Sequence, residues 1–344
     1  MTGRWRDLAW AGAGLLVLLL VPLFGAPPAI RDFIMFGMAY GLLAMSLNLL
    51  IGYSGLVSFG HAMFFASGAY AFGLAMQSGK FSIPAAFALA IVFTAVLALI
   101  VGAICVRLNE IYFAFLTLAF QMLFYNIILG WVSFTGGDQG LMGGIPRPKF
   151  LGIDLADRTQ LYVFCSVAFI VCIAILRQLV TSPFGYTLRL IRDNQERAAF
   201  LGVNVPLVKL TCFVISACVA AVGGILLTLF VSGAYPNFGF WTTSGEAIFM
   251  ILLGGSNVFL GPLVGTVILR LLNDITVTYT SHTELVLGIV ILILVLGLRK
   301  GPLDLIAERL ENRRQAAAQA VRDAADAGAT ESRATETGKG GSRC

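Results

Sequence analysis

Charged side chains are scarce in this sequence: Asp, Glu, Lys and Arg make up only 12% of its 344 residues, about half of the ~25% typical of soluble globular domains. A soluble protein of this length needs more charge than that to cover its surface. The charges also fall in a few clusters. Between them lie apolar runs of about 20 residues, enough to cross a ~30 Å hydrocarbon core at ~1.5 Å per residue. The composition excludes an ordinary cytosolic enzyme and predicts an all-α polytopic membrane protein.

The sequence also has few residues of the types that catalyse reactions or bind metals. It contains two histidines, and its six cysteines include no CxxC pair, so neither a metal site nor a disulfide framework is indicated. No GxxxxGK[ST] loop is present, because the two Gly-Lys pairs are followed by Phe81 and Gly340 rather than by a hydroxyl for Mg²⁺. A chain of buried Asp, Glu and His for proton coupling is missing too. We expect no catalytic residue, metal or cofactor in this chain, and energy supplied by another subunit.

Windows of about 19 residues predict the membrane spans. They are expected at residues 8–25, 32–51, 58–77, 84–106, 111–130, 160–179, 210–231, 244–260, 262–278 and 284–298. Arg270, Asn273 and Asp274 interrupt the ninth window, so the expected number of transmembrane helices is eight to ten. The first window has a second interpretation as a cleaved signal peptide, because Arg4 and Arg6 precede it and small residues follow it.

Lys and Arg lie mostly at the ends of these spans, so topology explains the net charge of +5 better than nucleic-acid binding does. With ten spans and an inner N-terminus, 17 of the 23 basic residues fall on the inner face and five on the outer face. This excess predicts cytoplasmic termini, a periplasmic loop at about 131–159 and a cytoplasmic loop at about 180–209. The transmembrane domain then covers residues 1–305, and residues 306–344 form a polar tail without the composition of a core.

Glycine is concentrated where spans meet, in Gly52–Gly73 and in Leu252–Gly265. Broken helices are tolerated inside a membrane only when protein shields them or when they line a watery cavity. Two explanations therefore stay open, a translocation pathway and close helix packing through small residues. Glu246 and Arg270 fall near predicted span ends, where their side chains could reach the interface. The candidate pathway residues are Asn48, Gly52, Ser54, Gly55, Ser58, Gly60, His61 and Gln121.

The cytoplasmic loop contains one predicted amphipathic helix, capped by Ser182 and ended by Gly202. Arg192 and Glu196 are four residues apart and would form a supporting pair on its charged face. Its small alanines and mixed charges favour docking into a partner protein over resting on lipid headgroups. The predicted apolar stripe consists of Leu188, Ile191, Ala198 and Leu201.

Three segments resemble the permease subunits of branched-chain amino-acid ABC transporters, in particular the M-type member of the pair. They are LNLLIGYSGLVSFGHAMFFASGAYA (Leu47–Ala71), RDNQERAAFLGVNV (Arg192–Val205) and GGSNVFLGPLVGT (Gly254–Thr266). The resemblance covers roughly residues 30–305, and the three motifs occur in the same order as in the family. Glu196, Ala198, Ala199 and Gly202 are also similar to the EAA…G loop of ABC importers, although Arg197 displaces one alanine.

The resemblance implies a type II importer-like permease in the bacterial inner membrane, embedded in lipid and binding no nucleic acid. It implies a second, homologous permease, two cytoplasmic ATPases that bind the ATP, and a periplasmic binding protein that delivers Leu, Ile or Val. Related permeases carry urea, short amides or other amino acids, and a gradient-driven carrier is a further alternative. The implied ATPase-coupling residues are Arg189, Arg192, Asp193, Asn194, Glu196, Arg197, Ala198, Ala199 and Gly202. The implied structural glycine turn contains Gly254, Gly255, Gly261, Pro262 and Gly265.

Overall fold

The computed structural model describes residues 27–279 except 109, 142–143, 147–148 and 151–152, together with the isolated residues 14, 18, 285, 286, 288, 289 and 292. The predicted tail at 306–344 lies outside the described residues, as do most residues of the first and tenth predicted spans. The described chain is helical apart from one antiparallel pair of two-residue strands, β1 (Lys149–Phe150) and β2 (Ile153–Asp154).

The helices follow the apolar windows of the sequence. In chain order they are α2 (Pro28–Asn48), the π-helical turn η1 (Leu49–Ser54), α3 (Ala62–Gln77), α4 (Ile83–Cys105), α5 (Glu110–Gly130), α6 (Val132–Thr135), the 3-10 turn η2 (Gly137–Gln139), α7 (Arg158–Val180), α8 (Pro183–Asp193), α9 (Gln195–Phe200), α10 (Val205–Val231), the 3-10 turn η3 (Pro236–Gly239), α11 (Trp241–Gly254) and α12 (Gly261–Tyr279).

Five helical segments of the described chain are long and apolar enough to cross a membrane: Pro28–Ser54, Ile83–Cys105, Ile111–Gly130, Arg158–Val180 and Val205–Val231. Of the other predicted spans, those at 58–77 and 244–260 correspond to α3 and α11, which are shorter, with 16 and 14 residues. The span at 262–278 corresponds to α12, whose hydropathy is lowered by Arg270, Asn273 and Asp274. The total of eight to ten transmembrane helices stays a prediction.

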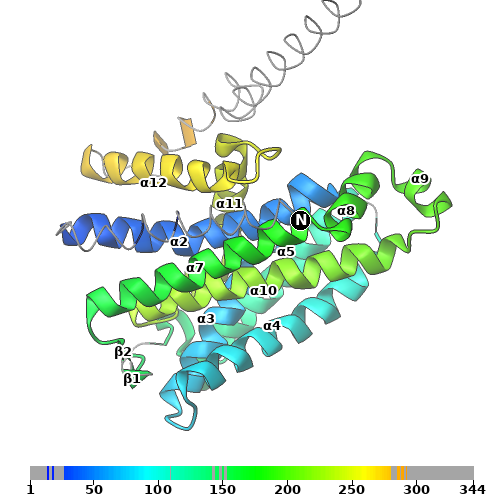
Figure 1. Ribbon diagram of the computed structural model, residues 1–344. Helices are drawn as coiled ribbons and strands as arrows, with labels where there is room; N and C mark the ends of the chain where they lie inside the picture. Colours follow the sequence, from blue (N-terminus) through cyan, green and yellow to red (C-terminus); the bar gives the residue numbers. More distant parts are fainter. Residues whose placement is uncertain are drawn as a thin grey trace, which may run out of the picture.

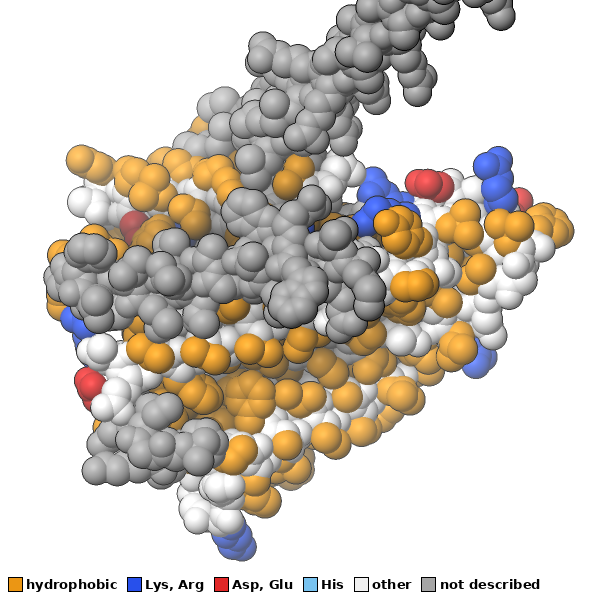
Figure 2. Space-filling model, in the orientation of Figure 1, with side chains coloured by type: hydrophobic (Ala, Val, Ile, Leu, Met, Phe, Trp, Pro, Cys, Tyr) orange, Lys and Arg blue, Asp and Glu red, His pale blue; other side chains and the backbone are white. Residues whose placement is uncertain are grey.

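Burial separates the core of the bundle from its apolar outer surface. In the most apolar part of each span, 72% of the residues are buried in α2 and in α10, but only 28% in α4 and in α5. Side chains such as Phe93 and Val96 on α4, and Phe115 on α5, are exposed. Figure 2 shows hydrophobic side chains across the side of the molecule and most of the visible charges near its two ends. An apolar belt of this extent is typical of a surface that faces lipid or a partner.

The two predicted loops lie at opposite ends of the bundle. In Figure 1, α2, α7, α10 and α4 run side by side, with α8 and α9 at one end and the β1–β2 hairpin at the other. The hairpin belongs to the predicted periplasmic loop, and α8 and α9 belong to the predicted cytoplasmic loop. The two loops therefore lie at opposite ends of the bundle, which agrees with the predicted topology.

Candidate functional site

Three segments far apart in the sequence meet at the end of the bundle that carries α8. These are η1 with the loop that follows it, the turn between α11 and α12, and α8 itself (Figure 1). Arg192, near the end of α8, joins all three. Its guanidinium donates a hydrogen bond from Nη1 to the carbonyl oxygen of Gly52 in η1, and another from Nη2 to Oδ1 of Asn257, at 3.3 Å.

The acceptor in η1 exists because the membrane helix is interrupted there. After Asn48 the α-helix widens into a π-helical turn, which ends at Gly55 with a φ of +76°. Carbonyls in the last turn of a helix lack partners within that helix, and a cation near them is favourable. Arg192 supplies that cation, and a Cβ added at Gly55 would lie 3.4 Å from its Cγ. A glycine at this position permits both the left-handed turn and the close approach of α8.

A direct contact also joins η1 to the turn between α11 and α12. Nδ2 of Asn48 donates a hydrogen bond to the carbonyl oxygen of Ser256, at 3.4 Å. A Cβ on Gly52 would lie only 2.6 Å from that same carbonyl oxygen, so the two backbones are close. The interrupted helix and the late glycine turn therefore form one unit beneath α8.

Further contacts attach the cytoplasmic loop to the membrane helices on either side of it. Nη2 of Arg189 donates to the carbonyl oxygen of Val180 at the end of α7, at 3.3 Å, and its guanidinium lies 5.3 Å from the ring centroid of Tyr53. Nζ of Lys209 in α10 donates to Oε1 of Gln195 in α9, at 2.7 Å. The loop is thus tied to both α7 and α10, so a displacement of the loop would pull on both helices.

The single helix predicted from Ser182 to Gly202 is wrong, because the structure has two helices there. Asn194 adopts an extended conformation, with φ of −161° and ψ of 105°, and its Oδ1 accepts a hydrogen bond from the amide of Arg197 at 2.8 Å. This side-chain cap starts a new helix and interrupts the earlier one. Arg192 and Glu196 therefore do not share a helical face, and no ion pair joins them in the described structure.

The break also changes which apolar side chains are buried. Leu188, Ile191 and Ala198 are buried as predicted, and the last two form a small cluster with Val205 of α10. Leu201 is 68% exposed, contrary to the prediction, because α9 ends before it. Phe200 is 91% exposed. Asp193, Glu196, Arg197 and Ala199 are exposed as well, so the outward face of the loop combines apolar and charged side chains.

We expect Asn194→Ala to loosen α9, because the helix loses its N-cap. Loss of such a cap costs ~1 kcal/mol, which corresponds to a roughly fivefold larger open population. Hydrogen–deuterium exchange of amides 195–200 should therefore accelerate about fivefold. The matched control is Asn204→Ala, which removes the cap that Asn204 provides to Leu207 of α10 and should leave exchange in α9 unchanged. Equal exchange in α9 for Asn194→Ala and the wild type would contradict the capping role.

The predicted pathway residues lie inside the bundle in this conformation. Asn48, Ser54, Ser58, His61 and Gln121 are all buried. Most of them bond between helices: Nε2 of His61 is 2.9 Å from Oγ of Ser46, and Nε2 of Gln121 donates to the carbonyl oxygen of Gly239 at 3.0 Å. A Cβ on Gly60 would lie 2.1 Å from the carbonyl oxygen of Thr117. The geometry here is that of close packing, and a role in translocation stays a prediction.

The predicted glycine turn lies where α11 and α12 approach most closely. Gly255 has a φ of +101° and ends α11, and Pro262 lies in the first turn of α12. A Cβ on Gly254 would lie 1.8 Å from the carbonyl oxygen of Gly261, and one on Gly265 would lie 1.7 Å from that of Met250. The two helices can pack at this distance only because side chains are missing at these positions.

Two residues of this site were missed by the sequence reasoning. Asn257 was part of a quoted motif, but nothing in its local pattern indicates a contact with a residue 65 positions away. Phe200 lay in the cytoplasmic loop, and its exposure depends on the end of α9. Within the part of the chain that the structure describes, no group of three His, Cys, Asp or Glu side chains is placed to hold a metal ion.

Several candidate membrane spans, joined at one end of the bundle by a short loop that contacts two helix breaks, define a multi-pass membrane protein. Residues 29–296 match the family model described as "Branched-chain amino acid transport system / permease component". The chain therefore belongs to this family of ABC transporter permeases and is a non-catalytic membrane subunit.

Individual relatives are similar at low identity over most of the chain. The permease protein LivM of a high-affinity branched-chain amino acid transport system from Escherichia coli is 24% identical, covering 88% of this chain and 76% of the relative. LivM from Salmonella typhimurium is 23% identical, covering 80% and 70%. LivH from Escherichia coli, also a permease protein of such a system, is 26% identical and covers 76% of this chain and 89% of its own length.

Proposed function

We propose that this chain is the permease subunit of an ATP-driven importer that moves branched-chain amino acids into a bacterium. It lies in the inner membrane with both termini in the cytoplasm. It pairs with a second, homologous permease, binds two cytoplasmic ATPases, and receives substrate from a periplasmic binding protein. The similarity to both LivM and LivH supports the pairing of two related permeases and the class of substrate.

The family match over residues 29–296 carries this proposal, and the bonds that Arg192 makes to η1 and to the turn after α11 support its coupling mechanism. Closure of the ATPases on ATP would displace α8 and α9. Because Arg189 and Lys209 tie the loop to α7 and α10, that displacement would tilt both helices. Arg192 would carry the same displacement to the two helix breaks, where the close packing around Gly52 and Ser256 would open and close. The chain contributes motion and selectivity, and its partners contribute energy.

Uptake by a strain that lacks this gene, with and without the gene restored, tests the function and the substrate together. We expect restored uptake of labelled leucine that unlabelled isoleucine and valine suppress, and that urea and acetamide leave unchanged. Competition by urea or acetamide instead would favour the alternative substrates. An uncoupler that abolishes uptake while ATP is held constant would favour a gradient-driven carrier and contradict the proposal.

Phe200→Ser should weaken binding of the ATPase subunits. A large aromatic side chain that is almost fully exposed beside charged residues has the features of an interface anchor, and loss of such an anchor costs ~2 kcal/mol, or roughly 30-fold in the dissociation constant. The measurement is titration of purified ATPase subunits onto the permease pair in nanodiscs. The matched control is Phe81→Ser, which changes an exposed phenylalanine two residues before α4. The start of α4 lies at the end of the bundle away from α8 (Figure 1). Equal weakening by both variants would contradict the assignment of this surface.

A further inference from the structure

A small cavity lies between α2, α11 and α12, away from the contacts of Arg192. Its volume is about 140 Å³, well below the ~300–1,000 Å³ of pockets for drug-sized ligands. Its walls combine apolar side chains with Glu246 from α11 and Arg270 from α12. The other lining residues are Phe36, Gly37, Tyr40, Met250, Thr266, Leu269 and Asn273.

The charged side chains of this cavity lie beside α2, which belongs to a candidate membrane span. Arg270 is halfway along α12, nine residues or ~13.5 Å from either end, so its expected position near a span end is wrong. Its guanidinium lies 4.6 Å from the ring centroid of Phe36, in the third turn of the candidate span that begins at Pro28. A charge at the centre of a membrane helix costs ~2.5–3.5 kcal/mol, and such residues usually face a partner or a water-filled path.

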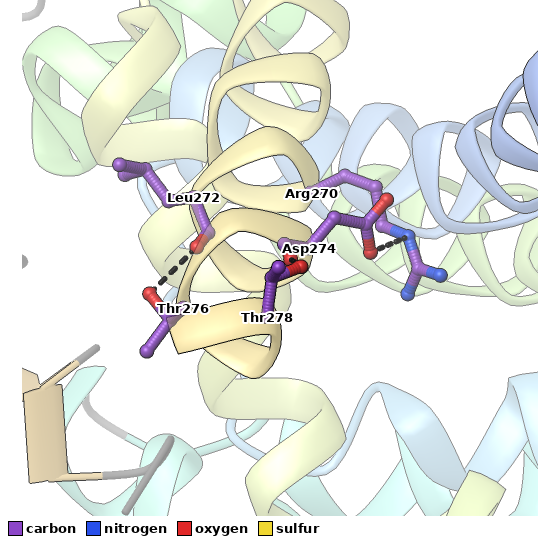
Figure 3. A network of polar contacts seen from close by, with 5 residues as sticks. All are labelled: Arg270, Leu272, Asp274, Thr276 and Thr278. Carbon is purple, nitrogen blue, oxygen red and sulfur yellow. Dashed lines mark hydrogen bonds and ion pairs between the residues drawn. The ribbon is translucent and has the colours of Figure 1, made fainter. Parts of the chain in front are cut away.

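Arg270 and Asp274 leave α12 on the same side, as Figure 3 shows, and Nε of Arg270 is 3.3 Å from Oδ1 of Asp274. The hydroxyl groups of Thr276 and Thr278 take no part in this ion pair. Thr276 donates to the carbonyl oxygen of Leu272 at 2.7 Å, and Thr278 donates to that of Asp274 at 2.8 Å, so both are satisfied within α12 (Figure 3). The contact between Arg270 and Asp274 is an ion pair by distance, but Nε of Arg270 makes no hydrogen bond within the described structure, so the guanidinium keeps donors for another acceptor.

The carboxylate of Glu246 also lines this cavity, and it has no ion pair or hydrogen bond to any described residue. Glu246, Arg270 and Asp274 together hold two negative charges and one positive charge. A ligand that brings both a carboxylate and an ammonium group could form two ion pairs here, its carboxylate with the terminal nitrogens of Arg270 and its ammonium group with Glu246. The apolar side chains of Phe36, Met250 and Leu269 would suit an aliphatic side chain.

We propose that this cavity is a transit site for the zwitterionic backbone of an α-amino acid, with its carboxylate bound by Arg270 and its ammonium group bound by Glu246. The inference rests on the proposed function and deepens it, because it names the groups that recognise the substrate class. Neutral solutes such as urea and acetamide have no charges to satisfy this pair. A path for neutral solutes would gain nothing from a guanidinium and carboxylates placed beside a membrane span.

The test uses the complete transporter, with both permeases, the ATPases and the binding protein, reconstituted in liposomes. In Glu246→Gln we expect ATP-driven uptake of labelled leucine to fall about tenfold, while the ATPase subunits still co-purify and ATP hydrolysis stays within twofold of the wild-type rate. Glu246→Asp keeps the charge and should recover at least a third of the uptake. Asp32→Asn is the control, because it removes a partly exposed carboxylate in the second turn of α2 and should leave uptake within twofold.

A binding measurement supports the uptake assay in case a variant assembles poorly. In the complete transporter, Asn273→Cys places a thiol in the cavity, and millimolar leucine should slow its labelling by a small maleimide at least threefold, whereas acetamide should not. Unchanged labelling with leucine, or full leucine uptake by an assembled Glu246→Gln complex, would overturn the inference and leave the proposed function standing. Absence of ATP-driven uptake of any solute by the wild-type complex would overturn the proposed function itself.

Discussion

Arg192→Ala should leave an assembled transporter that hydrolyses ATP without moving substrate. The variant loses the hydrogen bonds from the guanidinium to Gly52 and Asn257. Hydrogen bonds that involve a charged group contribute ~1.5–3 kcal/mol each. Loss of both would remove ~3 kcal/mol of coupling between α8 and the helix breaks, so we expect leucine uptake per ATP to fall roughly 100-fold. The measurement is the ratio of uptake to ATP hydrolysis in reconstituted liposomes.

Two further variants separate coupling from loss of positive charge. Arg192→Lys keeps the charge but presents a point cation rather than a planar fork, so we expect an intermediate ratio. Arg107→Ala removes an exposed arginine that follows α4, and it should leave the ratio within twofold of the wild-type value. A normal ratio in Arg192→Ala, or loss of ATPase binding rather than of coupling, would contradict the role that we assign to Arg192.

Gly265→Ala should prevent α11 and α12 from packing and remove most of the folded subunit from the membrane. A methyl group at this position would lie 1.7 Å from the carbonyl oxygen of Met250, which is backbone and cannot rotate away. Overpacking of a well-packed contact costs ~1–3 kcal/mol, and more when the backbone must move, against a total stability of ~5–15 kcal/mol for a typical protein. We expect at least a fivefold lower yield of monodisperse protein in fluorescence-detected size-exclusion chromatography.

Gly245→Ala is the matched control for this prediction. It is the same substitution on α11, but an added Cβ at this position meets nothing within 4 Å. Alanine also favours a helix over glycine by ~1 kcal/mol, so the yield should equal or exceed that of the wild type. Equal yields from Gly265→Ala and Gly245→Ala would show that the close approach of α11 and α12 is not required for folding.

The long apolar segments were predictable from the sequence because their periodicity and length are local properties. The span predicted at 84–106 differs from α4 by one residue at each end, and the span predicted at 111–130 differs from α5 by one residue at its start. Predictions were poorer where a single backbone conformation ends a helix. The eighth span was extended to residue 260, whereas the positive φ of Gly255 ends α11 at Gly254.

The loop residues show why the candidate site was only partly predictable. Arg192 was expected on the face presented to the ATPases, paired with Glu196. Its actual acceptors, Gly52 and Asn257, are 140 and 65 residues away in the sequence, and no local pattern reports contacts at such separations. The break at Asn194 had a local signal, because asparagine is a preferred N-cap and is less favourable inside a helix. A single helix was predicted because the charged and apolar residues on either side of Asn194 continue at helical spacing.

Accumulation of leucine in liposomes tests the central claim most directly, because the account assigns energy to the partners and gating to this chain. Liposomes that contain the permease pair, the ATPases and the loaded binding protein should concentrate leucine against its gradient only when ATP is present on the ATPase side. Liposomes that contain this chain alone should not concentrate leucine under any imposed proton or sodium gradient. Uphill accumulation by the chain alone would contradict the account.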